Sequence, residues 1–162
     1  MSLLLNGAKT ITIAGTEMQC IEIYTGEAYT FPFQFTDSVG NPINCTSWTL
    51  ATGVKYYVAD NITYNALGVA NQIDVGNLTL SGSSYTGGNL TAAFTTASTG
   101  IGYLYIPADL TGATGGGPVI TLANSAANTN IAVVTMTVTR TDALSTKSDV
   151  SKEPIGIIVR YQ

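Results

Sequence analysis

Apolar and polar residues alternate along much of this chain, with many β-branched residues among them. Segment 9–14 shows this pattern, and in segment 28–36 it places Phe31, Phe33 and Phe35 on one face. A period of two residues is typical of a β-strand with one buried face. Helical periodicity never extends beyond two turns in this sequence. The chain is therefore predicted to be all-β, with less than about a tenth of its residues in helix.

The same alternation recurs between clusters of Gly, Pro, Asn and Asp, which favour turns. Further strands are expected at 18–24, 48–50, 54–58, 101–106, 131–140 and 154–161. Seven or more short strands with turn signals every 8–12 residues or so indicate a β-sandwich or barrel. We therefore predict an antiparallel β-sandwich, immunoglobulin-like or jelly-roll-like. It spans 1–162 as a single domain, with a loop-rich or hairpin insertion around 59–100.

Positions in phase on the expected strands identify the candidate core. The residues expected to be mostly buried are Phe31, Phe33, Phe35, Trp48, Val138 and Ile158. Pro32 removes a backbone donor from its strand, so its nitrogen is expected to face a sheet edge or a bulge. Residues 141–153 carry charge and are expected to form an exposed hairpin loop.

Charge is scarce, and this restricts the partners. The chain has 6 Lys and Arg, 10 Asp and Glu, and a net charge of −4. Because no basic stripe is available to neutralise phosphates, the sequence argues against nucleic-acid binding. A surface with so few charges favours a subunit that is largely covered by partners, since free proteins usually keep more charge for solubility. The alternative is a threonine-rich extracellular domain that is simply monomeric.

The sequence gives no indication of a membrane partner. No apolar run approaches the 18 or so residues of a membrane-spanning helix, and Met1–Leu5 is too short for a signal-peptide core. Synthesis in a cytoplasm is therefore expected. Cys20 and Cys45 lie on separate expected elements, where free buried thiols are favoured over a disulfide. Their spacing fits no metal site.

Catalytic chemistry has little support. The chain contains no histidine, so the usual serine and cysteine triads are excluded. The acids considered for glycoside hydrolysis or calcium binding are Glu17, Glu22, Glu27, Asp60, Asp74 and Asp109. Solvated strand faces and turns explain these acids more simply. We predict no enzyme activity, no cofactor, and no catalytic, cofactor-binding or metal-ligating residue.

Aromatic and hydroxyl side chains suggest a binding role. Nine tyrosines are present, and Tyr24, Tyr64 and Tyr85 lie in or beside expected loops. Tyrosine suits both sugar stacking and protein contacts, and the sequence does not separate the two uses. Thr135, Thr137 and Thr139 alternate along one strand and are expected to give a polar sheet face.

One stretch of the chain resembles a known family. Segment 26–42, GEAYTFPFQFTDSVGNP, followed by 43–50, INCTSWTL, is similar to a pattern of tailed-phage proteins. In that pattern a G-x-x-Y strand runs into F-x-D-x-x-G-x-P and then another strand. The segment 131–161 also resembles it, with two strands around a charged loop. The similarity is to the N-terminal immunoglobulin-like domain of siphophage upper baseplate proteins and to modules of tail-fibre and neck proteins. It covers about half of the chain and departs in the middle.

The resemblance implies a non-enzymatic virion structural protein. The leading hypothesis is a tail, baseplate or fibre-attachment component, present in the virion after synthesis in the host cytoplasm. The alternatives are a capsid decoration (cement) protein and a carbohydrate-binding or adhesin module. The expected partners are other virion proteins of the tail, baseplate or capsid, contacted by a homo-oligomer or by many copies, with a host glycan as a further candidate. Contacts are expected from the terminal segments, including strand 155–161 added to a neighbouring sheet, and from loops 81–100 and 111–130.

Overall fold

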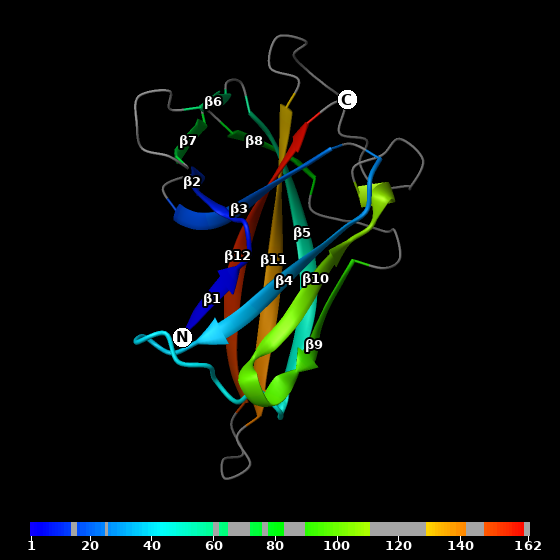
Figure 1. The fold of residues 1–162 in the computed structure, drawn as a ribbon. Helices are drawn as coiled ribbons and strands as arrows, with labels where there is room; N and C mark the ends of the chain where they lie inside the picture. The colour runs from blue at the N-terminus through cyan, green and yellow to red at the C-terminus, as the bar shows by residue number, and fades with distance from the viewer. Residues whose placement is uncertain are drawn as a thin grey trace.

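The chain folds into two β-sheets packed face to face (Figure 1). The computed structural model describes residues 1–13, 16–24, 26–59, 62–64, 72–75, 78–82, 90–110, 129–141 and 148–160. The smaller sheet has the order β1 (Ser2–Leu5), β4 (Tyr29–Thr36), β10 (Ile101–Ile106), β9 (Thr91–Thr96). The larger has the order β6 (Ile62–Tyr64), β7 (Gln72–Val75), β2 (Lys9–Ile13), β3 (Thr16–Tyr24), β12 (Ser148–Arg160), β11 (Thr129–Thr141), β5 (Trp48–Ala59), β8 (Leu78–Gly82). The predicted all-β sandwich is confirmed.

Helix is confined to two short segments within the part of the chain that the structure describes. These are the 3₁₀ helices η1 (Ala97–Thr99) and η2 (Ala108–Leu110). Among these residues no helix has the length and apolar character needed to cross a membrane. The low helix content agrees with the absence of helical periodicity in the sequence.

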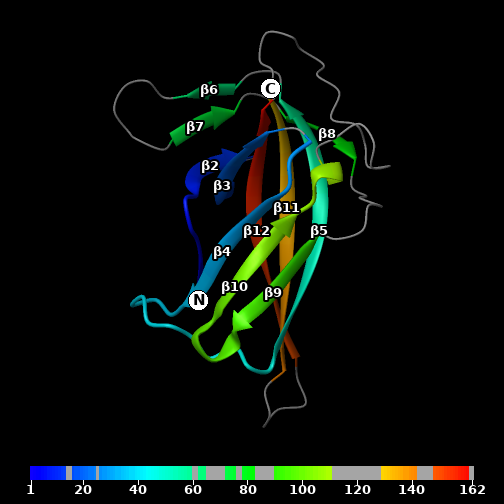
Figure 2. The ribbon, with the colours of Figure 1, turned by 45° about the vertical axis from the view of Figure 1, so that its right-hand side comes forward.

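Most strand pairs of the described segments are antiparallel, but two of them are parallel: β3 with β12, and β2 with β7. β12 lies in the middle of the larger sheet, between β3 and β11 (Figure 2). Its residues Ile155–Arg160 pair with β3 on one side and with β11 on the other. The expectation that strand 155–161 would be added to a neighbouring sheet is therefore wrong for the described residues 155–160. Both of its edges are already occupied inside this molecule.

The inner faces of the two sheets form the main core. β11 contributes Ala132, Val134, Met136 and Val138, all buried, as expected for every second residue of a strand. β4 contributes Phe33 and Phe35, and the ring of Phe35 contacts those of Phe33, Trp48 and Phe94 at centroid distances of 5.5, 5.6 and 6.0 Å. This aromatic cluster joins both sheets, because Trp48 begins β5 of the larger sheet.

All six predicted core residues lie in or against the core, four of them buried and two partly buried. Phe33, Phe35, Val138 and Ile158 are buried, whereas Phe31 and Trp48 are only partly buried. β1 ends opposite Phe33, so among the described residues no strand lies beside the part of β4 that carries Phe31 on that side. Trp48 is the first residue of its strand and lines a surface hollow. Both partly buried residues thus lie where the sheet coverage ends.

The larger sheet also has a buried patch on its outer face. Ile158 and Gly156 point away from the core that holds Ile155 and Ile157. A side chain at Gly156 would lie 3.1 Å from Ile11 Cγ2 and 3.5 Å from Cys20 Cβ, so these groups share this face. Because Ile11 and Cys20 are buried as well, this part of the sheet is covered on both sides.

The edge position predicted for Pro32 is confirmed. The Asn6 N–H donates to the Pro32 carbonyl at 3.1 Å, and one residue's N–H and C=O positions point to the same side of a strand. The Pro32 nitrogen therefore faces the side of β1, one residue beyond the last β1–β4 pair, Leu5 with Phe33. The missing donor interrupts no ladder there.

Two predicted loops are partly strand. β12 begins at Ser148, so residues 148–153 extend the pairing with β11 instead of forming a hairpin loop. β3 does not reach this half of β12, which is a sheet edge where charged side chains are usual. In the predicted loop 81–100, residues 81–82 and 91–96 belong to strands, while 83–89 and 111–128 lie outside the described residues.

The free side of β1, an edge strand of the smaller sheet, is occupied by one side chain. The Leu5 N–H donates to Gln19 Oε1 at 2.7 Å, and Gln19 Nε2 donates to the Leu3 carbonyl. The amide thus occupies the place that a neighbouring strand would fill. Since Gln19 lies on β3, these bonds tie the smaller sheet to the larger one.

Candidate functional site

Two of the six acids considered in the sequence take part in local contacts. Glu22 forms an ion pair with Lys9 at 3.4 Å, and the Tyr29 hydroxyl donates to the Glu27 carboxylate at 2.6 Å. Asp109 lies in η2. Asp60 and the side chain of Asp74 lie outside the described residues. Within the described ranges no three His, Cys, Asp or Glu side chains are grouped as metal ligands would be.

Two carboxylates share one hollow. Glu17 and Glu153 line a depression of about 380 Å³ together with Gln19 and Thr10. Burial raises the pKa of Glu153, and the positive amino group of Met1 opposes that rise. The two carboxylates come from β3 and β12, strands that the sequence did not predict to be neighbours.

Both cysteines are free and buried, as expected. Burial raises the pKa of Cys20 from 9.0 to about 12, with Glu22 adding to the rise, and raises that of Cys45 to about 11. The thiolate is the reactive form, so both groups are inert near neutral pH.

We expect neither thiol to react with iodoacetamide in the native protein at about pH 8, and both to react in denaturant. The native state holds the thiol protons more tightly than the unfolded chain does. The free energy of unfolding should therefore fall as pH rises from 9.0 toward 12. Urea melts across that range measure the slope, and a Cys20→Ala, Cys45→Ala double variant should show a smaller slope. Rapid alkylation of the native protein would contradict the prediction.

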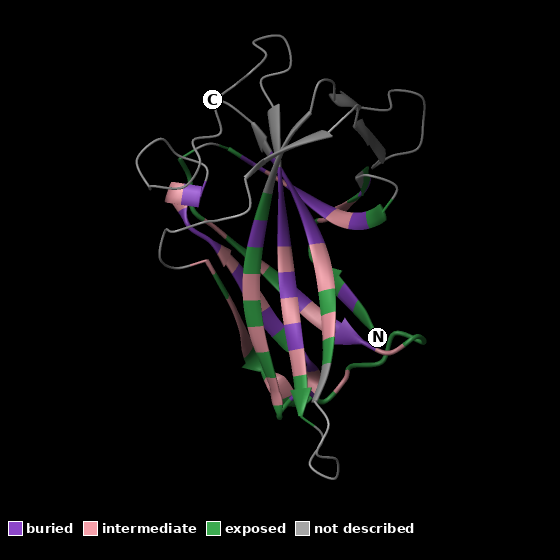
Figure 3. Cartoon of the chain, turned by 180° about the vertical axis from the view of Figure 1, so that it is seen from behind, coloured by how far each residue is buried: buried purple, intermediate pink, exposed green. Residues whose placement is uncertain are grey.

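The larger sheet has an exposed outer face at the end where β12 begins. We call this surface the threonine face. β5, β11 and β12 lie side by side there without β3 or β8 (Figure 3). Its outward residues are Thr49, Ala51, Gly53, Thr135, Thr137, Thr139, Val150, Lys152 and Pro154. They form rows across the strands, such as Thr49–Thr139–Val150. Lys152 is the only charged residue among these nine, and Val150 is 58% exposed.

The threonine face confirms one sequence expectation and enlarges it. The alternation of Thr135, Thr137 and Thr139 does place them on one face, opposite the buried Met136 and Val138. Their neighbours on β5 and β12 could not be predicted, because strand register is set by long-range pairing.

The outer face of the smaller sheet forms a second surface, which we call the tyrosine face. Its outward residues are Leu4, Thr30, Pro32, Gln34, Thr91, Ala93, Ile101, Tyr103 and Tyr105. None of these nine is charged. Tyr103 lies in a row between Pro32 and Ala93, and Tyr105 lies between Thr30 and Thr91. The middle rows of this surface therefore carry two aromatic rings, and the ring of Tyr105 has a threonine on each side.

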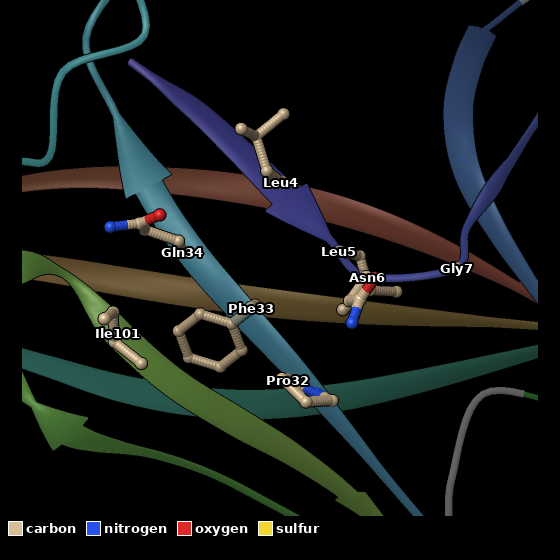
Figure 4. A pocket seen from close by; sticks show the side chains of 8 residues that line it. All are labelled: Leu4, Leu5, Asn6, Gly7, Pro32, Phe33, Gln34 and Ile101. Carbon is tan, nitrogen blue, oxygen red and sulfur yellow. The ribbon is translucent and has the colours of Figure 1, made fainter.

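A groove adjoins the tyrosine face where β1 ends. It has a volume of about 460 Å³, and its lining comes from β1, β4, β10 and the turn after β1 (Figure 4). Leu4, Pro32 and Ile101 supply apolar walls, while Asn6 and Gln34 supply side-chain amides. Gln34 is positioned by a bond from its Nε2 to the Thr99 carbonyl at 3.1 Å. Pro32 and Ile101 line the groove and also lie next to Tyr103, because Pro32 pairs with Tyr103 and Ile101 precedes it on β10.

The sequence prediction named other tyrosines. Tyr24 is exposed at the end of β3, the side chain of Tyr64 is outside the described set, and so is Tyr85. Tyr103 and Tyr105 were missed as a pair. Their signal was the Tyr-Leu-Tyr alternation within 101–106, which places both rings opposite the buried Leu104.

Comparison with known proteins gives no family assignment for this chain. No protein-family model matches the sequence, and no curated protein matches it. The two uncharged or nearly uncharged sheet faces therefore carry the functional argument.

Proposed function

We propose that this chain is a non-enzymatic structural protein of a tailed-phage virion, bound to other virion proteins in several copies. The observation that carries the proposal is the threonine face, a sheet surface with one charge among its nine outward residues. The resemblance of segment 26–50 to siphophage baseplate modules supports the same role.

The threonine face is suited to a close, low-charge contact. Its side chains are mostly Thr, Ala, Gly, Val and Pro, which lose little rotamer entropy when a partner covers them. Threonine hydroxyls both donate and accept hydrogen bonds, so they can satisfy a partner's backbone without a charged group. Burying such a face therefore avoids the desolvation cost of ionised side chains.

The size of the face argues for many copies. Three strands spaced about 4.8 Å apart over six residues cover roughly 300 Å². A stable protein contact usually buries about 800 Å² on each partner. One threonine face is thus too small alone, and binding gains strength when symmetry holds several copies against a particle.

A tail, baseplate or fibre-attachment position is the leading form of the proposal. A capsid decoration protein requires the same low-charge contact and stays as the alternative. Fractionation of particles into tails and capsids separates them, since the chain should remain with the substructure it contacts.

The test is to wash purified particles, or a reconstituted complex, in salt from about 0.05 to about 1 M and to assay the pellet for this chain. The screening length between charges shortens from about 30 Å at 0.01 M salt to about 3 Å at 1 M salt, so a charge-driven contact would weaken. We expect retention across the range. Release at modest salt would contradict the low-charge contact, and absence from particles would contradict the virion role.

A further inference from the structure

The tyrosine face has a feature that the virion proposal does not use. Its groove of about 460 Å³ falls within the roughly 300–1,000 Å³ of small-molecule sites. The groove is bordered by Pro32, which pairs with Tyr103, and by Ile101, which precedes Tyr103 on the same face of β10. A hollow of this size next to the row of Tyr103, with Tyr105 in the row beyond, fits a small ligand or a short chain of units better than a broad protein contact.

The chemistry of the face restricts the ligand to a neutral one. None of the nine outward residues of the tyrosine face is charged. An ionic ligand would therefore lose part of its hydration there without gaining an opposite charge. Aromatic rings and a proline ring offer flat apolar surface, while Gln34, Asn6 and Thr30 offer amides and a hydroxyl. A pyranose ring has apolar C–H faces and a rim of hydroxyls, and this pattern is complementary to such a surface.

The spacing of the two tyrosines adds a direction. Residues two apart on one strand lie about 6.6 Å apart along it, so Tyr103 and Tyr105 can support successive units of an extended ligand that runs along β10. The geometry points to a site for a neutral saccharide on the tyrosine face, with Tyr103 and Tyr105 stacking on sugar rings and the groove holding one end. This site is independent of the proposed virion contact, which uses the opposite sheet.

The test is a titration of the isotope-labelled full chain followed by backbone amide NMR. The probes are the methyl glycosides of glucose, galactose and N-acetylglucosamine, together with maltohexaose, cellohexaose and chitohexaose. Single sugars should bind in the millimolar range, as expected for a ligand with few atoms, and at least one hexasaccharide more tightly. The shifted amides should lie on β4, β10 and the turn after β1.

Variants separate stacking from a general loss of fold. Tyr103→Ala and Tyr105→Ala should each weaken binding about tenfold or more, whereas Tyr105→Phe keeps the ring and should stay within about threefold. Tyr24→Ala removes an exposed tyrosine elsewhere and should change nothing. Shifts in none of the six probe titrations, shifts centred elsewhere, or equal binding by the alanine variants would overturn the inference. Tighter binding of an anionic saccharide such as heparin would overturn its neutral specificity.

Discussion

Replacing Phe35 with alanine should lower the free energy of unfolding by about 3–5 kcal/mol. Phe35 is fully buried and its ring contacts Phe33, Trp48 and Phe94. Removing it loses the burial of the ring and leaves a cavity between the sheets. Since a whole domain is stable by about 5–15 kcal/mol, this single change should remove a large share of that total. Urea denaturation followed by circular dichroism measures it.

Phe31→Ala is the matched control. Phe31 lies on the same face of β4 but is only partly buried, and its ring contact is with Tyr29 at 5.8 Å. The same chemical change should therefore cost clearly less, because less surface returns to water. Equal losses for the two variants, or a loss below about 1 kcal/mol for Phe35→Ala, would show that the register of β4 is wrong.

Ala51→Glu should remove the chain from particles almost completely, by about a hundredfold or more. Ala51 is exposed on the threonine face, and its neighbour across the strand pair is Thr137. An unpaired carboxylate buried in a contact costs several kcal/mol, and about 2.7 kcal/mol already corresponds to a hundredfold change. The amount of chain per particle, measured by quantitative mass spectrometry after co-sedimentation, reports the effect.

Two further variants make that result specific. Val39→Glu introduces the same acid at a side chain that is 81% exposed in the turn after β4, and it should leave the particle content unchanged. Ala51→Ser keeps the site small and neutral and should also assemble. The free energy of unfolding of Ala51→Glu, Val39→Glu and Ala51→Ser should stay within about 0.5 kcal/mol of that of the parent, as is usual for surface changes. Normal assembly of Ala51→Glu would contradict the proposed contact.

The strands that sequence reasoning found are those with clean alternation. Segment 101–106 and segment 131–140 match β10 and most of β11. β1 was not predicted, because Leu3, Leu4 and Leu5 form an unbroken apolar run. In the structure Leu3 and Leu5 are buried while Leu4 is 51% exposed, so the alternation lies in the burial and not in the residue types.

Pairing between distant segments accounts for most of what was missed. The charges at Asp149, Lys152 and Glu153 suggested a loop, yet the ladder with β11 continues through them. Hydrogen bonds to a strand already formed outweigh weak local preference, which depends on the position in the sheet. For the same reason, the two candidate faces could be predicted from the sequence only in part. Alternation gives the residues of one strand that share a face, but only the register adds Ala51 and Val150 to the threonines.

The central position of β12 sets an order for biosynthesis. β12 lies between β3 and β11 and pairs with both. Until residues 148–160 leave the ribosome, these two strands cannot be joined, and the apolar residues beside the place of β12 stay uncovered. The β3–β12 pairs connect residues more than 130 positions apart, such as Gln19 with Ile155. Pairings between such distant segments close slowly, and the waiting strands expose edges on which other chains can add. Chains truncated before β12 should therefore aggregate instead of accumulating as a folded intermediate.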